Sequence, residues 1–237
     1  MSIGDGELDL FLHTSVANPF WDIPSFLDFV WASLRGEAGL RALCERSPKA
    51  RAAAEGGMRR APSSFAPLSY ASMMVTRWVD ATGEQLVRYR LVPADGETND
   101  GVPTPEDRAT PWSQARAADE RRAVDYLATE WAARLSAGPV VYRLQVQRRP
   151  RPGAPAAAYD AGTPWAPDVF PWRELGRVTL DAALDPAALA ALRLRVDRQP
   201  ASLGLFEATS ATDFNALGHV RSRLYPRAQA ARRLRGG

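Results

Sequence analysis

The sequence is poor in the residues from which most metal and covalent sites are built. Among its 237 residues there is one cysteine, Cys44, and there are two histidines, His13 and His219. A single cysteine excludes an intrachain disulfide and any zinc or iron–sulfur cluster held by several cysteines. Two distant histidines exclude a histidine-rich metal centre and leave little basis for a Ser-His-Asp triad.

Lysine and long apolar runs are also scarce. Lys49 is the only lysine, so arginine supplies nearly all of the 30 basic residues, which face 27 acidic ones. The apolar runs are too short for a membrane span. The N-terminal residues lack the basic start and apolar stretch of a secretory signal. The sequence therefore predicts a cytoplasmic protein without a membrane span.

Arginine is concentrated in three places, at 59–60, 148–151 and 232–235. A nucleic-acid-binding protein would need a basic stripe with interleaved aromatic residues, or a known motif. The sequence has neither, so we expect no nucleic-acid partner. Binding of carboxylates is the better use for these arginines.

Common catalytic motifs are missing from a chain that is otherwise typical of a folded protein. It is 46% hydrophobic and contains seven tryptophans, which excludes overall disorder. It has no phosphate-binding loop, no nucleophile elbow, no dinucleotide fingerprint and no HExxH zinc motif. The acidic residues are scattered over predicted helix surfaces, which is typical of solvated faces.

Periodicity predicts a mixed α and β chain. Helical spacing of apolar residues predicts helices over 25–34, 37–54, 116–136 and 211–234, with Ser25 as the cap of the first. Alternation predicts strands over 73–79, 86–92, 140–146 and 174–180, the first two joined by a turn at 80–83. A Pro-rich connection covers 148–172. No glycine-rich turn follows a strand, so a doubly wound α/β fold is not expected.

The C-terminal helix contains a pair of residues with a specific chemistry. Arg221 and Tyr225 are four residues apart, so they share one helix face. A guanidinium beside a phenol favours the phenolate, and phenolate is a recognised axial ligand of haem iron. On spacing alone, the same pattern also fits an ordinary amphipathic helix with Tyr225 as a half-buried anchor.

This pair ends an ordered set of segments that resembles the catalase family. The set comprises LDLFLHTSVANPFWDIPSFLDFV at 8–30, YASMMV at 70–75, GPVVYRLQVQ at 138–147, TPW at 163–165, and Arg221-x-x-x-Tyr225-Pro226 at the place of the family's proximal signature. Each segment is loose, but their order covers nearly the whole chain. The resemblance implies an α+β fold: a partial catalase-type antiparallel β-barrel with flanking and C-terminal helices.

The resemblance also implies a single domain, 1–237, in three parts. A distal-side and helical segment would cover 8–56, barrel strands and a helix 68–182, and a proximal ligand helix 183–237. Family members have a further N-terminal stretch, which supplies the distal histidine and the first half of the barrel. We expect this chain to lack that portion.

The family's site residues can be placed on matching positions. The resemblance implies haem b as the cofactor and Tyr225 as the proximal iron ligand, with Arg221 holding its oxygen ionised. Arg232 would pair with a haem propionate, Phe26 would lie against the haem face, and the remaining cofactor-binding residues would line the distal pocket: Phe20 and Trp21. For Phe20, Trp21 and Phe26, simple core packing is the alternative.

The chain departs from the family at two points. Arg223 replaces the usual phenylalanine two residues before Tyr225, and Arg227 replaces the aspartate after Pro226. Near Thr14 and Ser15, where the distal asparagine is expected, there is none. His13 is the nearest catalytic candidate, although it is not at the family's histidine position. A missing distal base would slow peroxide cleavage, because such acid–base help is typically worth about 10²–10⁴ in rate.

Two functional interpretations remain. The first is a haem-binding, catalase-like protein that breaks down hydrogen peroxide or organic hydroperoxides. The second is a degenerate or truncated catalase-fold module without haem, which acts in binding or assembly. In either case four strands would leave open sheet edges, so we expect a homo-oligomer or a partner chain that completes the barrel.

Overall fold

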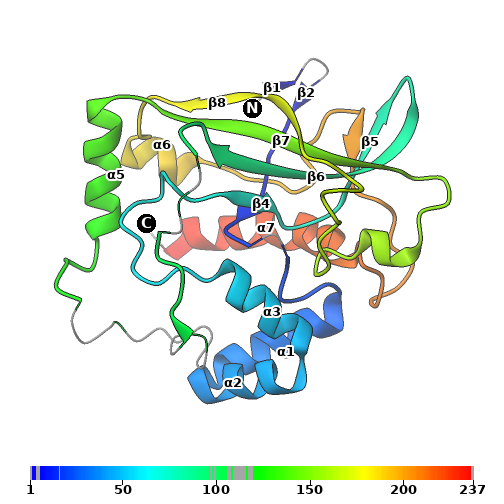
Figure 1. Ribbon diagram of the computed structural model, residues 1–237, viewed down its shortest axis with the longest axis horizontal. Coiled ribbons are helices and arrows are strands. Elements are labelled where there is room, and N and C mark those ends of the chain that lie inside the picture. The colour runs from blue at the N-terminus through cyan, green and yellow to red at the C-terminus, as the bar shows by residue number, and fades with distance from the viewer. Residues whose placement is uncertain are drawn as a thin grey trace.

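The protein is built around an antiparallel sheet that is covered on one face by helices (Figure 1). The structure is a computed structural model, and it describes residues 2–3, 6–15, 17–96, 98, 100–105, 108, 116 and 120–235. In this part of the chain, seven strands form the main sheet, and a two-stranded ribbon lies apart from it. The ribbon pairs β1 (Ser2–Ile3) with β2 (Gly6–Glu7).

Two long strands form the centre of the main sheet. β6 (Gly83–Pro93) pairs along its whole length with β7 (Val140–Pro150), and β7 pairs with the edge strand β8 (Arg173–Leu180). Two strands pair with the other side of β6, at different positions along its length: β5 (Thr76–Asp80) and β4 (Tyr70–Ser72). They pair in turn with the sheet's two shortest strands: β9 (Leu203–Gly204) and β3 (Leu12–His13). Within the described residues β8 pairs with β7 alone, so the sheet is open.

Strand register divides the sheet into two chemically different faces. Residues directly opposite each other on neighbouring strands share a face, and His13, Ala71, Arg90 and Gln145 are opposite one another across four strands. With Arg88 and Gln147 they form what we call the polar face. The other face carries the apolar cluster of Val87, Tyr89, Leu144 and Val146. Alternation along β6 and β7 therefore places Arg88, Arg90, Gln145 and Gln147 on the face opposite this cluster.

Helices lie below the sheet in Figure 1, on the side of the polar face, because Arg221 of the C-terminal helix acts on His13. The long helix α7 (Ala216–Arg235) runs under the sheet, and three helices form a further layer beyond it. These are α1 (Ile23–Leu34), α2 (Gly36–Arg46) and α3 (Pro48–Gly57). The remaining helical elements are peripheral: α5 (Tyr126–Ala137), α6 (Pro186–Ala191) and the 3₁₀ turn η1 (Ala156–Tyr159).

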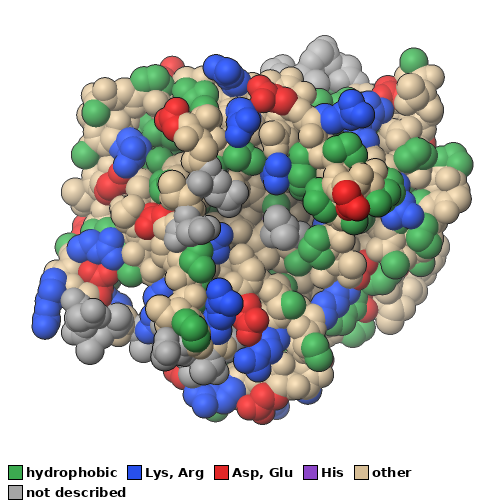
Figure 2. All heavy atoms as spheres, in the orientation of Figure 1, with side chains coloured by type: hydrophobic (Ala, Val, Ile, Leu, Met, Phe, Trp, Pro, Cys, Tyr) green, Lys and Arg blue, Asp and Glu red, His purple; other side chains and the backbone are tan. Residues whose placement is uncertain are grey.

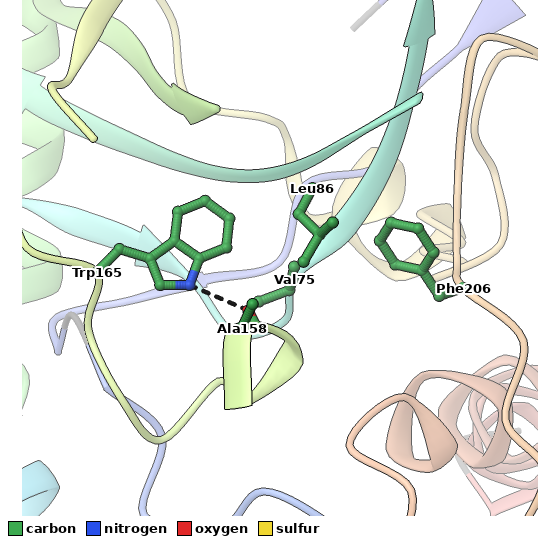
Figure 3. Close-up of a cluster of buried hydrophobic side chains, with 5 residues drawn as sticks. All are labelled: Val75, Leu86, Ala158, Trp165 and Phe206. Atoms are coloured by element: carbon green, nitrogen blue, oxygen red, sulfur yellow. Dashed lines mark hydrogen bonds between the residues drawn. The ribbon is translucent and has the colours of Figure 1, made fainter. Parts of the chain in front are cut away.

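An apolar cluster joins the sheet to the long connection between β7 and β8. Figure 3 shows Leu86 and Val75 from the sheet region facing Ala158, Trp165 and Phe206. The indole nitrogen of Trp165 donates a hydrogen bond to the Ala158 carbonyl oxygen at 3.0 Å. This bond fixes the Trp165 ring beneath the sheet.

The predicted strands are confirmed with altered bounds. The strands expected over 140–146 and 174–180 are β7 and β8, and the strand expected over 86–92 is β6. The stretch predicted over 73–79 is wrong at its start, because the chain leaves the sheet after β4 and re-enters it at β5. The turn between β5 and β6 is tight, since Asp80 and Gly83 pair directly, and Gly83 has φ 103°.

The helix predictions needed four corrections, one of which is that the helix expected over 211–234 begins only at Ala216. Asp22, rather than Ser25, caps α1: its carboxylate accepts the Ser25 N–H at 2.8 Å, and Ser25 completes a capping box. The helix expected over 37–54 is two helices, because Ser47 adopts an extended conformation and caps α3, which begins at Pro48. The helix expected over 116–136 begins only at Tyr126, and residues 117–119 lie outside the described part.

Charged side chains of both signs are interspersed on the face shown in Figure 2. None of the helices in the described residues is long and apolar enough to cross a membrane.

Candidate functional site

Arg221 and Tyr225 lie one turn apart on α7, on the side that faces the sheet. Arg221 is only 8% exposed, and its Nη1 is buried without a hydrogen-bond partner. Burial lowers the pKa of Arg221, and the neighbouring Tyr225 oxygen opposes that shift. Tyr225 is half-buried. A buried cation with an unused donor, next to a phenol, is an arrangement that stabilises phenolate.

Two phenylalanine rings contact this pair, and two more pack on one of them. The Phe11 ring packs against the Tyr225 ring with centroids 5.4 Å apart. The Arg221 guanidinium carbon lies 5.6 Å from the centroid of Phe20, which contacts Phe26 at 5.1 Å. Phe20 is buried and also packs on Phe29. The aromatic groups exclude water from the guanidinium, which strengthens its electrostatic effect on its neighbours.

His13 belongs to the same cluster. It lies on β3, and its Nε2 is buried without a hydrogen-bond partner. Burial, together with the positive charges of Arg221 and Arg88, lowers the pKa of His13 to about 4. The imidazole is therefore neutral at physiological pH. The structure thus brings five of the predicted site residues together: His13, Phe20, Phe26, Arg221 and Tyr225.

Trp21 lies against a different group. The Lys49 Nζ is 3.9 Å from the centroid of the Trp21 ring and forms an ion pair with Asp160. The buried Asp160 carboxylate also accepts hydrogen bonds from the Gly162 N–H at 2.8 Å and the Thr163 hydroxyl at 2.7 Å. Trp21 thus contributes to a polar junction between α3 and the β7–β8 connection.

Arg232 lies two turns beyond Tyr225 on α7. Its side chain is outside the described part of the structure, so its predicted role with a propionate stays a prediction.

Sequence reasoning missed three residues that the structure places beside this cluster. Phe11 covers the Tyr225 ring. Arg88, buried on β6, donates to the Asp160 carbonyl oxygen at 2.7 Å. Asn18 is 2% exposed and donates to the Met73 carbonyl oxygen, while its own Oδ1 is buried without a partner. The alternation of Arg88 with Arg90 was a visible signal, but the contacts of Phe11 and Asn18 are long-range and left no local pattern.

Comparison with curated proteins gives two informative relatives. The allene oxide synthase-lipoxygenase protein of Plexaura homomalla is 36% identical over 242 residues, which cover this whole chain but 22% of that protein. The uncharacterized protein y4iK of Sinorhizobium fredii is 34% identical over 179 residues, covering 73% of this chain and 77% of that protein. A linolenate 9R-lipoxygenase of Nostoc is 29% identical over 134 residues, or 17% of its length. No family model matches the chain.

Solved catalases have the same fold. A bacterial catalase superposes with a TM-score of 0.73 at 17% identity, covering 96% of this chain. Catalase A of Saccharomyces cerevisiae superposes with a TM-score of 0.67 at 15% identity, covering 95% of this chain. The chain spans 44–46% of these catalases. The predicted α+β, catalase-like architecture is therefore confirmed: the protein has a catalase-like fold and belongs to the same family as the uncharacterized protein y4iK.

Proposed function

We propose that the protein binds haem b with Tyr225 as the axial ligand of the iron. The observation that carries this proposal is the buried Arg221 guanidinium, whose unpartnered Nη1 lies one turn before the phenol. The donor set therefore fits a ferric haem, because a hard anionic oxygen ligand needs a nearby cation to stay ionised. Arg232 would pair with a propionate, and Phe20, Trp21 and Phe26 would contact the macrocycle or its pocket.

When bound, the haem supplies the redox chemistry that cleaves an O–O bond. The chain's own residues are better suited to holding the haem than to moving a proton. Arg221 would supply positive charge beside the Tyr225 oxygen, and the neighbouring phenylalanine rings would limit the access of water to the guanidinium. His13 is the proposed proton acceptor, but a pKa of about 4 makes its Nε2 a weak base at neutral pH. Because general bases work best with a pKa near the operating pH, we expect haem binding to be accompanied by slow peroxide turnover.

We favour organic hydroperoxides over hydrogen peroxide as the substrate class. Two of the relatives carry the name of an enzyme: one is named for allene oxide synthase and lipoxygenase, and the other for a linolenate lipoxygenase. Comparison of cumene hydroperoxide with hydrogen peroxide as substrates tests this preference, and a higher kcat/KM for hydrogen peroxide would contradict it.

The alternative is a catalase-fold module that works in binding or assembly without haem. One observation favours it: the Phe11 ring already lies against Tyr225. A macrocycle at Tyr225 therefore requires Phe11 to move.

We also propose that the chain is a single catalase-like domain that associates through its sheet edges. β8 lies at one edge, and β3 and β9 lie at the other. Unpaired edges are templates for pairing with another chain. A second copy, or a partner chain, would complete the sheet.

Reconstitution with haemin tests the haem proposal. We expect a saturable Soret band for the native chain and its loss, or the loss of the phenolate charge-transfer band, in Tyr225→Phe. Tyr159→Phe is the matched control, because Tyr159 packs on Phe206 away from this cluster and should bind haem normally. If Phe11 blocks the site, Phe11→Ala should strengthen binding. The absence of a Soret band in the native chain and in Phe11→Ala would favour the haem-free alternative.

A further inference from the structure

A cavity lies on the polar face of the sheet, where Arg88 and Arg90 project from β6. It has a volume of about 230 Å³ and is lined by Arg88, Arg90, Trp165 and Trp172 among others; we call it the arginine–tryptophan cavity. Its lining includes none of the predicted haem residues. Among the described residues that line it, none is acidic. The described lining thus combines two guanidinium groups with two indole rings.

The floor of this cavity is rigid. Gln147, 2% exposed, donates to the carbonyl oxygen of Phe170 at 2.6 Å and to that of Trp165 at 3.3 Å. Trp165 is itself fixed by its bond to Ala158 (Figure 3). The cavity thus keeps its shape without a ligand, which lowers the entropic cost of binding.

The two arginines differ in burial but act on the same space. Arg88 is 5% exposed, and its guanidinium carbon lies 5.3 Å from the centroid of the Trp165 ring. Arg90 is half-buried, and its guanidinium carbon lies 4.4 Å from the centroid of Trp172. They share one face of β6 because they are two residues apart. Each ring holds one guanidinium in place and also offers an apolar surface.

The nearest buried carboxylate does not occupy this cavity. Arg88 contacts the backbone carbonyl of Asp160, whereas the Asp160 carboxylate is held by Lys49, Gly162 and Thr163. Arg90 donates to the amide oxygen of Gln145 at 2.7 Å. Burial lowers the pKa of Arg88 to about 10, so it remains cationic at neutral pH. A guanidinium carries five N–H donors, so it can hold a protein oxygen and a ligand together.

We propose that the arginine–tryptophan cavity binds a small organic carboxylate, whose carboxyl group pairs with Arg88 and Arg90 and whose apolar body lies against Trp165 and Trp172. Carboxylate is favoured because the planar guanidinium matches its geometry. The volume corresponds to roughly eight water molecules at about 30 Å³ each, which suits an anion the size of benzoate. The exposed prolines Pro164 and Pro167 form the rim.

Isothermal titration calorimetry on the haem-free chain tests this proposal with three probes of similar shape. Benzoate should bind, its neutral isostere benzamide should bind at least about tenfold more weakly, and the cation benzylammonium should not bind. Equal affinity for benzoate and benzamide would overturn the proposal, as would the absence of benzoate binding.

Variants locate the binding. Arg90→Gln should weaken benzoate binding at least about tenfold, and Trp172→Leu should weaken it further when combined with Arg90→Gln. Arg177→Gln is the matched control, since Arg177 is exposed on β8 and outside the lining. Tyr225→Phe should bind benzoate like the native chain, which separates this site from the haem proposal. Equal affinities in Arg90→Gln and Arg177→Gln would refute it.

Discussion

Replacing Asp160 with asparagine should destabilise the protein strongly, because it leaves the only lysine without its counter-charge. Asp160 is 5% exposed, and Lys49 bonds its Oδ2 across 111 residues of sequence. In Asp160→Asn the oxygen that accepts the Gly162 N–H is retained, whereas the amide NH₂ that replaces Oδ2 removes the acceptor of both Lys49 and the Thr163 hydroxyl. The Lys49 ammonium would keep its positions over the rings of Trp21 and Phe214.

The magnitude follows from burial. Removing one partner of a buried ion pair costs about 3–5 kcal/mol. The Lys49 side chain is 28% exposed, so water would recover part of this loss, and we expect about 2–4 kcal/mol. For a chain of this length, each kcal/mol shifts Tm by about 2–4 °C. Asp160→Asn should therefore lower Tm by roughly 4–15 °C.

Thermal and urea unfolding measure the effect, with Glu55→Gln as the control. Glu55 pairs with Arg51 at 2.9 Å on the surface of α3, where such a pair contributes less than about 0.5 kcal/mol. A double-mutant cycle with Lys49→Met should give a coupling energy above about 1 kcal/mol. If Asp160→Asn costs no more than Glu55→Gln, or the coupling is near zero, the reasoning is refuted.

Three further predictions concern protonation and capping. Because the folded pKa of His13 is about 4, against an ordinary 6.5, the unfolded chain binds the proton first, and stability should fall by up to about 3 kcal/mol from pH 6.5 to 4. Urea unfolding of His13→Gln should show no such loss between these pH values. A pH profile of stability identical to that of the native chain would contradict this prediction. Asp22→Ala should lower stability by about 1 kcal/mol in thermal unfolding, through the α1 cap. Arg221→Gln should release haem at a higher pH on acidification, because the phenol of Tyr225 loses the charge that favours ionisation; an unchanged release midpoint would disprove that role.

Short-range sequence patterns predicted two of the strands and the spacing of the proposed ligand pair. Alternation predicted β7 and β8, because their side chains point in turn to the sheet's two faces. The Arg221–Tyr225 pair was predictable because one helical turn fixes their separation. The resemblance to catalases supplied the overall order of the segments, which the fold comparison supports.

Other features depend on contacts between distant residues. The helix predicted over 37–54 is interrupted at Ser47, where the backbone is extended. The Ser47-Pro48 step was a local signal for this interruption, but the helical spacing of apolar residues continued across it. The Lys49–Asp160 ion pair and the contact of Phe11 with Tyr225 join segments more than a hundred residues apart. No spacing rule connects such residues, so only the folded chain shows them.

A crystal structure of the haemin-reconstituted chain would test the central claim most directly. The account predicts the iron bonded to the Tyr225 oxygen, with the Arg221 guanidinium hydrogen-bonded to that oxygen and Phe11 displaced from the ring. Iron bonded to His13 or His219 instead, or haemin bound only at the molecular surface, would contradict it.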